Sequence, residues 1–91
     1  MHKSLYTRGN KTFLLLLTEL RTASGMTQKE LARRLKEEQS WISKVERGVR
    51  RLDLVELTLW CRALGVPLSN FVAEYERRLG STLDLNDAKS K

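Results

Sequence analysis

Residues 26–48 constrain the fold most strongly, because they predict two short helices joined by a tight connection. Thr27 is suited to cap the first helix, and Glu30 stands three residues later, as a capping box requires. The apolar side chains of this helix recur on a single stripe: Leu31, Ala32 and Leu35. A charged segment interrupts that stripe, so a new element is expected to begin after it.

The second helix of this stretch has two contrasting faces. Ile42 and Val45 resume the apolar stripe, and Gly48 stands where a left-handed residue usually follows a helix. The outer face carries amides, hydroxyls and basic groups: Gln39, Ser40, Ser43, Lys44 and Arg47. A short helix with one buried stripe and an outer face of this kind suits the major groove of DNA.

This stretch resembles the Cro/repressor-type (XRE-like) helix-turn-helix regulators of bacteria and phages. The residues that carry the resemblance are Thr27-Gln28, Glu30-Leu31-Ala32, Gln39-Ser40-Trp41-Ile42-Ser43-Lys44, Glu46-Arg47-Gly48 and, further on, Ala63-Leu64-Gly65-Val66-Pro67. It covers residues 12–73, most of the chain. The resemblance implies an all-α, lambda-repressor-like DNA-binding domain, which is a compact five-helix bundle containing the helix-turn-helix.

Helical periodicity and its stop signals divide the chain into one domain and two flexible ends. Helices are predicted from Asn10 or Lys11 to Ser24, over 28–35, 39–47 and 54–64, and from Pro67 to Arg78 or Leu79. Asp53 is expected to cap the fourth helix. The DNA-binding domain, with a C-terminal dimerisation helix, therefore spans 10–79. It lies between a flexible N-terminus, 1–9, and a flexible tail, 80–91.

Composition excludes several classes of protein. Ninety-one residues, 41% of them hydrophobic, suffice for one small domain. No apolar run reaches the length of a membrane span, so a cytoplasmic protein that does not enter the membrane is expected. One cysteine and one histidine exclude an intrachain disulfide and leave too few ligands for a metal. Without a catalytic constellation or a phosphate loop, neither an enzyme nor a cofactor is predicted.

The net charge of +6 is concentrated in the part that resembles a helix-turn-helix. Residues 29–51 carry a net charge of +4, whereas residues 52–91 carry −1. A basic run is commonly just a solvated surface. Its coincidence with the helix-turn-helix instead favours contacts with DNA phosphates.

The resemblance also implies roles for individual side chains. Gln39, Ser40 and Lys44 occupy the positions that contact base edges, where glutamine pairs with adenine and lysine reaches guanine. The alternative is that they are ordinary exposed polar groups. The residues predicted to contact the DNA backbone are Thr27, Gln28, Lys29, Arg33, Trp41, Ser43, Arg50 and Arg51. Thr27 has the alternative of a pure cap, and Trp41 that of a shield at the edge of the core.

Two departures from the family pattern lie in the connection before the second helix. Lys36 stands where the family commonly has glycine with positive φ, and a non-glycine residue there costs about 1 kcal/mol. Either the turn has another shape or the cost is accepted. Glu37 and Glu38 suit a helix N-terminus, but they would repel phosphates if they faced DNA.

Two further pairings are expected away from the DNA. The resemblance implies an ion pair between Arg21 and Glu46 that fastens the first helix to the third. In the fifth helix, Val72, Tyr75 and Leu79 continue an apolar stripe beyond Leu68 and Phe71 and have no obvious partner within the chain. They are therefore predicted to form a homodimer interface, which Val55 and Leu59 would extend. The alternative is that Leu83 or Leu85 covers the stripe.

The leading functional hypothesis is a sequence-specific transcriptional regulator, a repressor, that binds double-stranded DNA as a homodimer at a palindromic operator. One alternative is the antitoxin of a toxin–antitoxin pair, although few residues follow the fifth helix for wrapping a toxin. Another is the controller of a restriction–modification operon. A pulldown from the host separates the first two hypotheses, because only an antitoxin retains a stoichiometric second protein. The identity of any further protein partner is not predicted.

Overall fold

The computed structural model describes residues 8–80, and every regular element in that range is a helix. The elements are α1 (Arg8–Ala23), α2 (Gln28–Leu35), α3 (Gln39–Glu46), α4 (Leu54–Leu64) and α5 (Leu68–Leu79). The prediction of an all-α bundle of five helices is confirmed. None of the helices in this range is long and apolar enough to cross a membrane.

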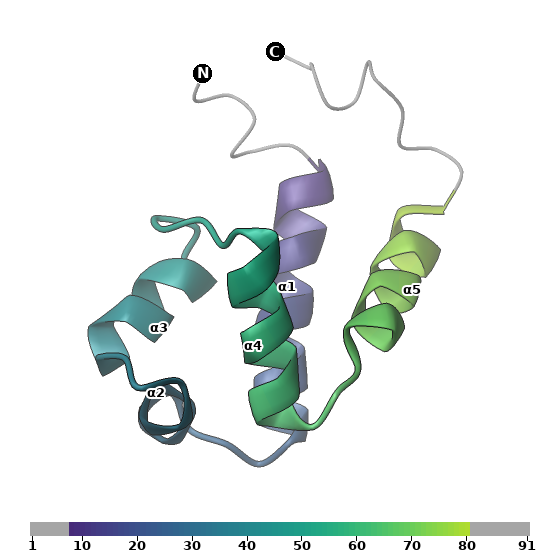
Figure 1. Cartoon of the computed structure of the whole chain (residues 1–91). Coiled ribbons are helices and arrows are strands. Elements are labelled where there is room, and N and C mark those ends of the chain that lie inside the picture. The colour runs from purple at the N-terminus through teal and green to yellow at the C-terminus, as the bar shows by residue number, and fades with distance from the viewer. Residues whose placement is uncertain (1–7, 81–91) are drawn as a thin grey trace.

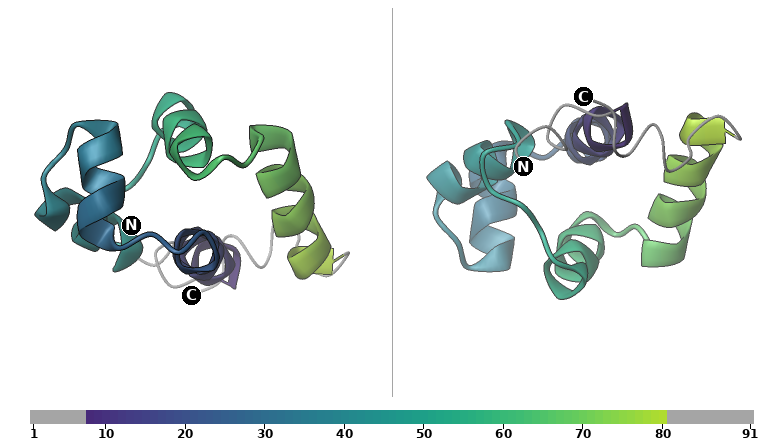
Figure 2. Two further views of the ribbon diagram at one scale, coloured as in Figure 1. Left: turned by 90° about the horizontal axis from the view of Figure 1, so that it is seen from below. Right: turned by 90° about the horizontal axis from the view of Figure 1, so that it is seen from above.

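The helices form a central pair flanked on two sides. In Figure 1, α4 lies in front of α1, with the α2–α3 pair on one side and α5 on the other. The two end-on views of Figure 2 show the same order and place α5 far from α3. Helix α1 packs against both α3 and α5, and α4 packs against both α2 and α5. The central pair therefore fixes the position of the helix-turn-helix.

One core draws side chains from all five helices: Leu16, Leu17, Leu31, Ala32, Ile42, Val45, Trp60, Cys61, Leu64 and Phe71. Trp60 and Phe71 are the largest of its fully buried side chains. Fully burying a side chain of this size stabilises a fold by roughly 1.5–3 kcal/mol. Because α2 and α3 each contribute to the core, the helix-turn-helix cannot move independently of α1 and α4.

The helix starts follow the capping signals in the sequence. Thr27 accepts a hydrogen bond from the Glu30 amide, and the Glu30 side chain accepts one from the Thr27 amide, which completes the predicted capping box. Asp53 and Glu56 form a second box at α4. Helices α2 and α4 have the bounds that the sequence predicts. Pro67 precedes α5 as its N-cap rather than lying within its first turn.

Gly48 follows α3 with φ +81°, so the predicted left-handed stop is confirmed. A Cβ atom added at this position would lie 2.8 Å from a methyl carbon of Leu14. Glycine is therefore required both by the backbone conformation and by the close approach of α1.

The first helix begins earlier than predicted, because α1 starts at Arg8 rather than at Asn10 or Lys11. The first turn is held by α5: the Arg8 guanidinium donates to the Leu79 carbonyl at 3.1 Å, and the Tyr75 hydroxyl donates to the Gly9 carbonyl at 3.1 Å. These contacts join residues far apart in the sequence, so local periodicity could not reveal them. The remaining residues of the two predicted flexible ends, 1–7 and 81–91, lie outside the described range.

The prediction that Tyr75 and Leu79 lack partners within the chain is also wrong. The Tyr75 ring packs edge-on against Phe13 of α1 with ring centroids 6.2 Å apart, and Leu79 is 7% exposed. Helix α1, which is longer than predicted, covers this part of α5. Of the three residues predicted for the dimer interface, Val72 alone is among the exposed large hydrophobic side chains. The alternative cover, Leu83 or Leu85, lies outside the described residues.

Candidate nucleic-acid interface

Helix α3 is oriented by its own apolar side. Ile42 and Val45 are buried in the core, and the helix packs against α1 and α2. On the opposite side Gln39, Ser40 and Lys44 are exposed. The three predicted base-contacting side chains therefore share the solvent-facing surface of one helix, fixed from behind by the core.

The connection between α2 and α3 turns through Lys36, which has the left-handed conformation φ 58°, ψ 44°. Its amide donates to the carbonyls of the last turn of α2. The chain therefore accepts the cost of a non-glycine residue in this conformation, about 1–2 kcal/mol. Of the two alternatives that the sequence left open, a different turn or an accepted cost, the structure shows a positive φ at Lys36.

A groove of about 380 Å³ lies between α2 and the start of α3. Its lining residues are Lys29, Ala32, Arg33, Glu37, Glu38 and Gln39. Two predicted phosphate contacts, Lys29 and Arg33, thus lie beside one predicted base contact. Both carboxylates of the connection line the same groove, so a phosphate entering it would meet positive charge from α2 and negative charge at the start of α3.

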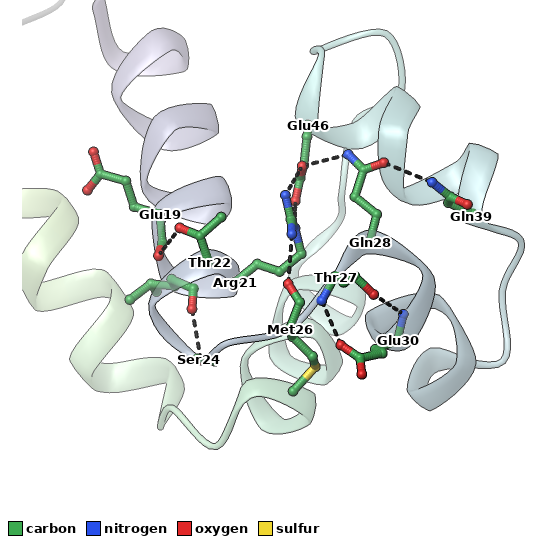
Figure 3. Close-up of polar contacts among 11 residues, drawn as sticks. Glu19, Arg21, Thr22, Ser24, Met26, Thr27, Gln28, Glu30, Gln39 and Glu46 are labelled. Atoms are coloured by element: carbon green, nitrogen blue, oxygen red, sulfur yellow. Dashed lines mark hydrogen bonds and ion pairs between the residues drawn. The ribbon is translucent and has the colours of Figure 1, made fainter.

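Gln28 does not extend freely into solvent. Its amide nitrogen donates to Oε1 of Glu46 at 2.9 Å, and its amide oxygen accepts from Nε2 of Gln39 at 3.4 Å. Glu46 is in turn paired with Arg21, whose Nε lies 2.7 Å from the Glu46 Oε2. Figure 3 shows these side chains in one row, from α1 through the end of α3 and α2 to the start of α3. The Arg21–Glu46 pair was expected from the resemblance, but Gln28 was predicted only as a phosphate contact, so its hydrogen bonds to Glu46 and Gln39 were missed.

The two hydroxyl groups predicted to hold phosphates both have partners. Thr27 accepts from the Glu30 amide at 3.0 Å, and Ser43 accepts from Nε of Arg47 at 3.2 Å. The hydrogen bond from the Thr27 amide lowers the pKa of Glu30. Thr27 therefore acts as a cap in this structure, while a hydroxyl proton remains available at both sites because each oxygen serves here as an acceptor.

Arg50 has a structural role that the sequence did not reveal. Its guanidinium forms two hydrogen bonds with the Glu56 carboxylate, at 3.1 and 2.8 Å, and lies 5.4 Å from the centre of the Trp41 ring. These hydrogen bonds, with that from the Asp53 amide, lower the pKa of Glu56. Trp41 also contacts the core through Trp60, with ring centroids 6.2 Å apart. Glu56 belongs to the capping box of α4, three residues after the cap Asp53. This spacing was the signal in the sequence that could have identified Glu56 as an ordered carboxylate near Arg50.

Within residues 8–80, no three histidine, cysteine or acidic side chains are placed to hold a metal ion. Cys61 is buried, and burial raises the pKa of its thiol to about 11. The polar groups of the interface suit hydrogen bonding and charge contacts with a polyanion.

Comparison with known proteins gave results of three kinds. A family model described as helix-turn-helix matches residues 17–71. No curated protein matched. Among solved structures, an XRE-family like protein from Pseudomonas syringae is 41% identical over 77% of this chain and 85% of that chain, with a TM-score of 0.72.

Two other solved structures are less similar in sequence. The wild-type restriction–modification controller protein C.Esp1396I is 26% identical over 76% of this chain and 90% of its own, with a TM-score of 0.70. The clp gene regulator ClgR from C. glutamicum is 26% identical over 71% and 83%, with a TM-score of 0.65. The residues that the family model matches include the whole of α2 and α3.

Proposed function

Since the chain belongs to the XRE-type helix-turn-helix family of DNA-binding transcriptional regulators, we propose that it is a repressor that binds a palindromic operator as a homodimer. The outer surface of α3 carries this proposal. Gln39, Ser40 and Lys44 are exposed there, while the buried side of the helix is fixed in the core. An amide and an ammonium group on a rigid helix match the base-edge patterns of the major groove.

Base recognition is tested by titrating a selected operator and a random duplex with the wild type and two variants. Gln39→Ala and Lys44→Ala should each weaken operator binding by about 1–3 kcal/mol, the discrimination of a good bidentate contact. Binding to random DNA should change much less. Equal losses on both duplexes would assign these side chains to the backbone, and the proposed base contacts would be withdrawn.

Phosphate contacts are assigned to exposed basic residues, of which Lys29 and Arg33 on α2 are the clearest. Each phosphate neutralised lowers the slope of log K against log salt by about 0.9. Lys29→Ala should therefore weaken binding to all sequences alike and flatten that slope. Arg62→Ala is the matched control, because Arg62 is exposed on α4, outside the helix-turn-helix. A wild-type slope near zero would exclude backbone binding.

The dimer is proposed to form through exposed apolar residues of α4 and α5. Val55 and Leu59 of α4 are 67% and 51% exposed, and Val72 of α5 is 40% exposed. A two-fold axis would place these side chains against their own copies. Tyr75 and Leu79 would support this interface indirectly, because their hydrogen bonds with residues of α1 hold α5 in place. Two reading helices would then contact half-sites about one turn of DNA, roughly 34 Å, apart.

Light scattering at tens of micromolar protein tests the dimer. The wild type should be dimeric and the double variant Leu59→Asp/Val72→Asp monomeric, with weaker operator binding. Leu15→Asp is the control, because Leu15 is similarly exposed, at 55%, but lies on α1. A monomeric wild type, or a Leu15→Asp variant that dissociates equally, would refute this interface.

Similarity to C.Esp1396I supports a second candidate, a controller of restriction–modification genes. Locating the selected operator in the host genome tests this candidate. A site beside restriction–modification genes supports the controller, and a site elsewhere contradicts it.

A further inference from the structure

The side chain of Arg50 lies beside the helix that carries the proposed base contacts. Arg50 belongs to the connection that runs from the end of α3 to the start of α4 (Figure 1). Its backbone amide donates to the Lys44 carbonyl at 3.1 Å, which holds it against the last turn of α3. Its guanidinium lies 5.4 Å from the centre of the Trp41 ring, near the start of the same helix. A phosphate beside α3 would therefore lie close to this positive charge.

The guanidinium of Arg50 is already held by a carboxylate of the protein. Two of its nitrogens donate to the two oxygens of Glu56, at 3.1 and 2.8 Å, and one of them also donates to the Arg51 carbonyl. A bidentate contact between a guanidinium and a carboxylate is among the strong, directional hydrogen-bonded pairs. Glu56 is itself fixed, because it accepts from the Asp53 amide at 2.9 Å in the capping box of α4. Both members of the pair are thus ordered, although the Arg50 side chain is 41% exposed.

Replacing Glu56 by a phosphate would give Arg50 no net advantage. The hydrogen bonds with Glu56 raise the pKa of Arg50, and the charges of Asp53 and Glu37 act in the same direction. A phosphate that displaced Glu56 would leave an uncompensated carboxylate beside the DNA backbone. One charge on the DNA would be neutralised and one negative charge would be exposed next to it. No counterion would be released on balance.

We propose that Glu56 withholds Arg50 from the DNA backbone, so that this carboxylate limits the sequence-independent part of DNA binding. This inference rests on the proposed function, because it assumes that the surface of α3 beside Arg50 faces DNA. Arg50 then orders the connection against Trp41 and makes no phosphate contact. The positive charge that the connection offers to DNA is smaller than a count of its basic residues suggests, because one of them is neutralised within the protein.

The test measures the slope of log K against log salt on a random duplex, where phosphate contacts supply essentially all of the affinity. Glu56→Gln removes the charge of the carboxylate and keeps the capping box, which accepts either glutamate or glutamine at this position. With Arg50 released, the slope should steepen by about 0.9 for each subunit. The gain in affinity between about 200 and 50 mM salt should accordingly be about 3- to 4-fold larger for each subunit than in the wild type.

Glu74→Gln is the matched control for a change of net charge. Glu74 also pairs with arginine, and its side chain is 33% exposed, against 27% for Glu56. It belongs to α5, which Figure 2 places far from α3. Its slope should equal that of the wild type. An equal steepening in Glu74→Gln would assign the effect to net charge alone and would overturn the proposal.

The double variant Arg50→Met/Glu56→Gln separates the proposal from a direct phosphate contact by Arg50. It removes a pair that is neutral as a whole, so it should keep the wild-type slope. If Arg50 contacts a phosphate in the wild type, the double variant should instead be flatter by about 0.9 for each subunit. Circular dichroism at the titration temperature verifies that each variant is folded.

A measurement on the wild type alone gives an independent check. The ¹³C chemical shift of the Glu56 side-chain carboxyl carbon should stay the same when random DNA is added, because Arg50 keeps its partner. A large change in this shift, with the same signal restored when the DNA is removed, would show that a phosphate displaces Glu56, and the proposal would be wrong.

The slopes also distinguish this proposal from the function on which it rests. A wild-type slope near zero would remove DNA-backbone binding, and the role of Glu56 with it. A clearly negative wild-type slope that Glu56→Gln leaves unchanged would overturn the role of Glu56 while DNA binding stands.

Discussion

Replacing Arg21 by methionine should destabilise the domain more than the loss of any surface ion pair. Arg21 makes two hydrogen bonds to Glu46 and a third to the Met26 carbonyl at 2.8 Å. Methionine fills much of the same space but offers no donor. The Glu46 carboxylate would then keep only the hydrogen bond from Gln28, and the Met26 carbonyl would lose its side-chain partner.

The magnitude follows from the burial of the pair. Removing one partner of a buried ion pair costs about 3–5 kcal/mol, because the remaining charge is left without compensation. The Arg21 side chain is 12% exposed, so water relieves a part of this cost and the lower end, about 3 kcal/mol, is appropriate. For a domain of this size that corresponds to a drop in melting temperature of about 12–24 °C.

The assay is thermal and urea unfolding followed by circular dichroism. All variants are compared at one protein concentration, because the proposed dimerisation would affect apparent stability. Arg77→Met is the matched control, since Arg77 pairs with Glu74 on the surface and its side chain is 71% exposed. Surface pairs contribute little, so this control should melt close to the wild type. If Arg21→Met also melts close to the wild type, the assignment of a buried, stabilising pair is refuted.

Three other sites give predictions that stability and labelling measurements can check. Lys36→Gly should change the free energy of unfolding by less than about 1 kcal/mol. The relief of about 1–2 kcal/mol of left-handed strain is offset by the greater entropy of the unfolded chain. Lys36→Val should be clearly destabilised in the same urea assay. Hydrogen bonds from Arg77 and Arg78 lower the pKa of Glu74 to about 2, so its stabilising contribution should be complete above about pH 5 and disappear as pH falls from 4.5 towards 2. Glu74→Gln should melt with a weaker dependence on pH in that window. The Cys61 thiol should react with a thiol reagent only as fast as the domain opens, since it is buried and its pKa is raised to about 11; rapid labelling of the native protein would contradict this.

The sequence predicted helix ends well, because caps and stops depend on residues that are close together in the chain. The capping boxes depend on residues three apart, so Thr27 with Glu30 could be recognised in the sequence, and Asp53 marked the start of α4. Gly48 and Gly65 marked helix ends because both adopt positive φ. The exposed side of α3 followed from periodicity once Ile42 and Val45 were assigned to the core.

Contacts between helices were beyond reach of the same reasoning. No partner for Tyr75 and Leu79 could be predicted, because the α1 residues that cover them lie more than sixty positions away in the sequence. Arg50 was predicted as a phosphate contact from its charge alone, although Glu56 holds it. A basic side chain in a loop is chemically suited to either role. Only the path of the chain decides whether a carboxylate lies within its reach.

The Arg21–Glu46 pair gives a last prediction about its two charges taken together, and a double variant tests it. Replacing both charges by methionine removes the uncompensated carboxylate, and such replacements are often neutral or stabilising. Arg21→Met/Glu46→Met should therefore melt well above Arg21→Met alone in the same thermal assay. A double variant that melts no higher than Arg21→Met would show that the unpaired charge is not the cause of the lost stability. The cause would then be the lost packing and the lost hydrogen bonds to the Met26 carbonyl and from Gln28.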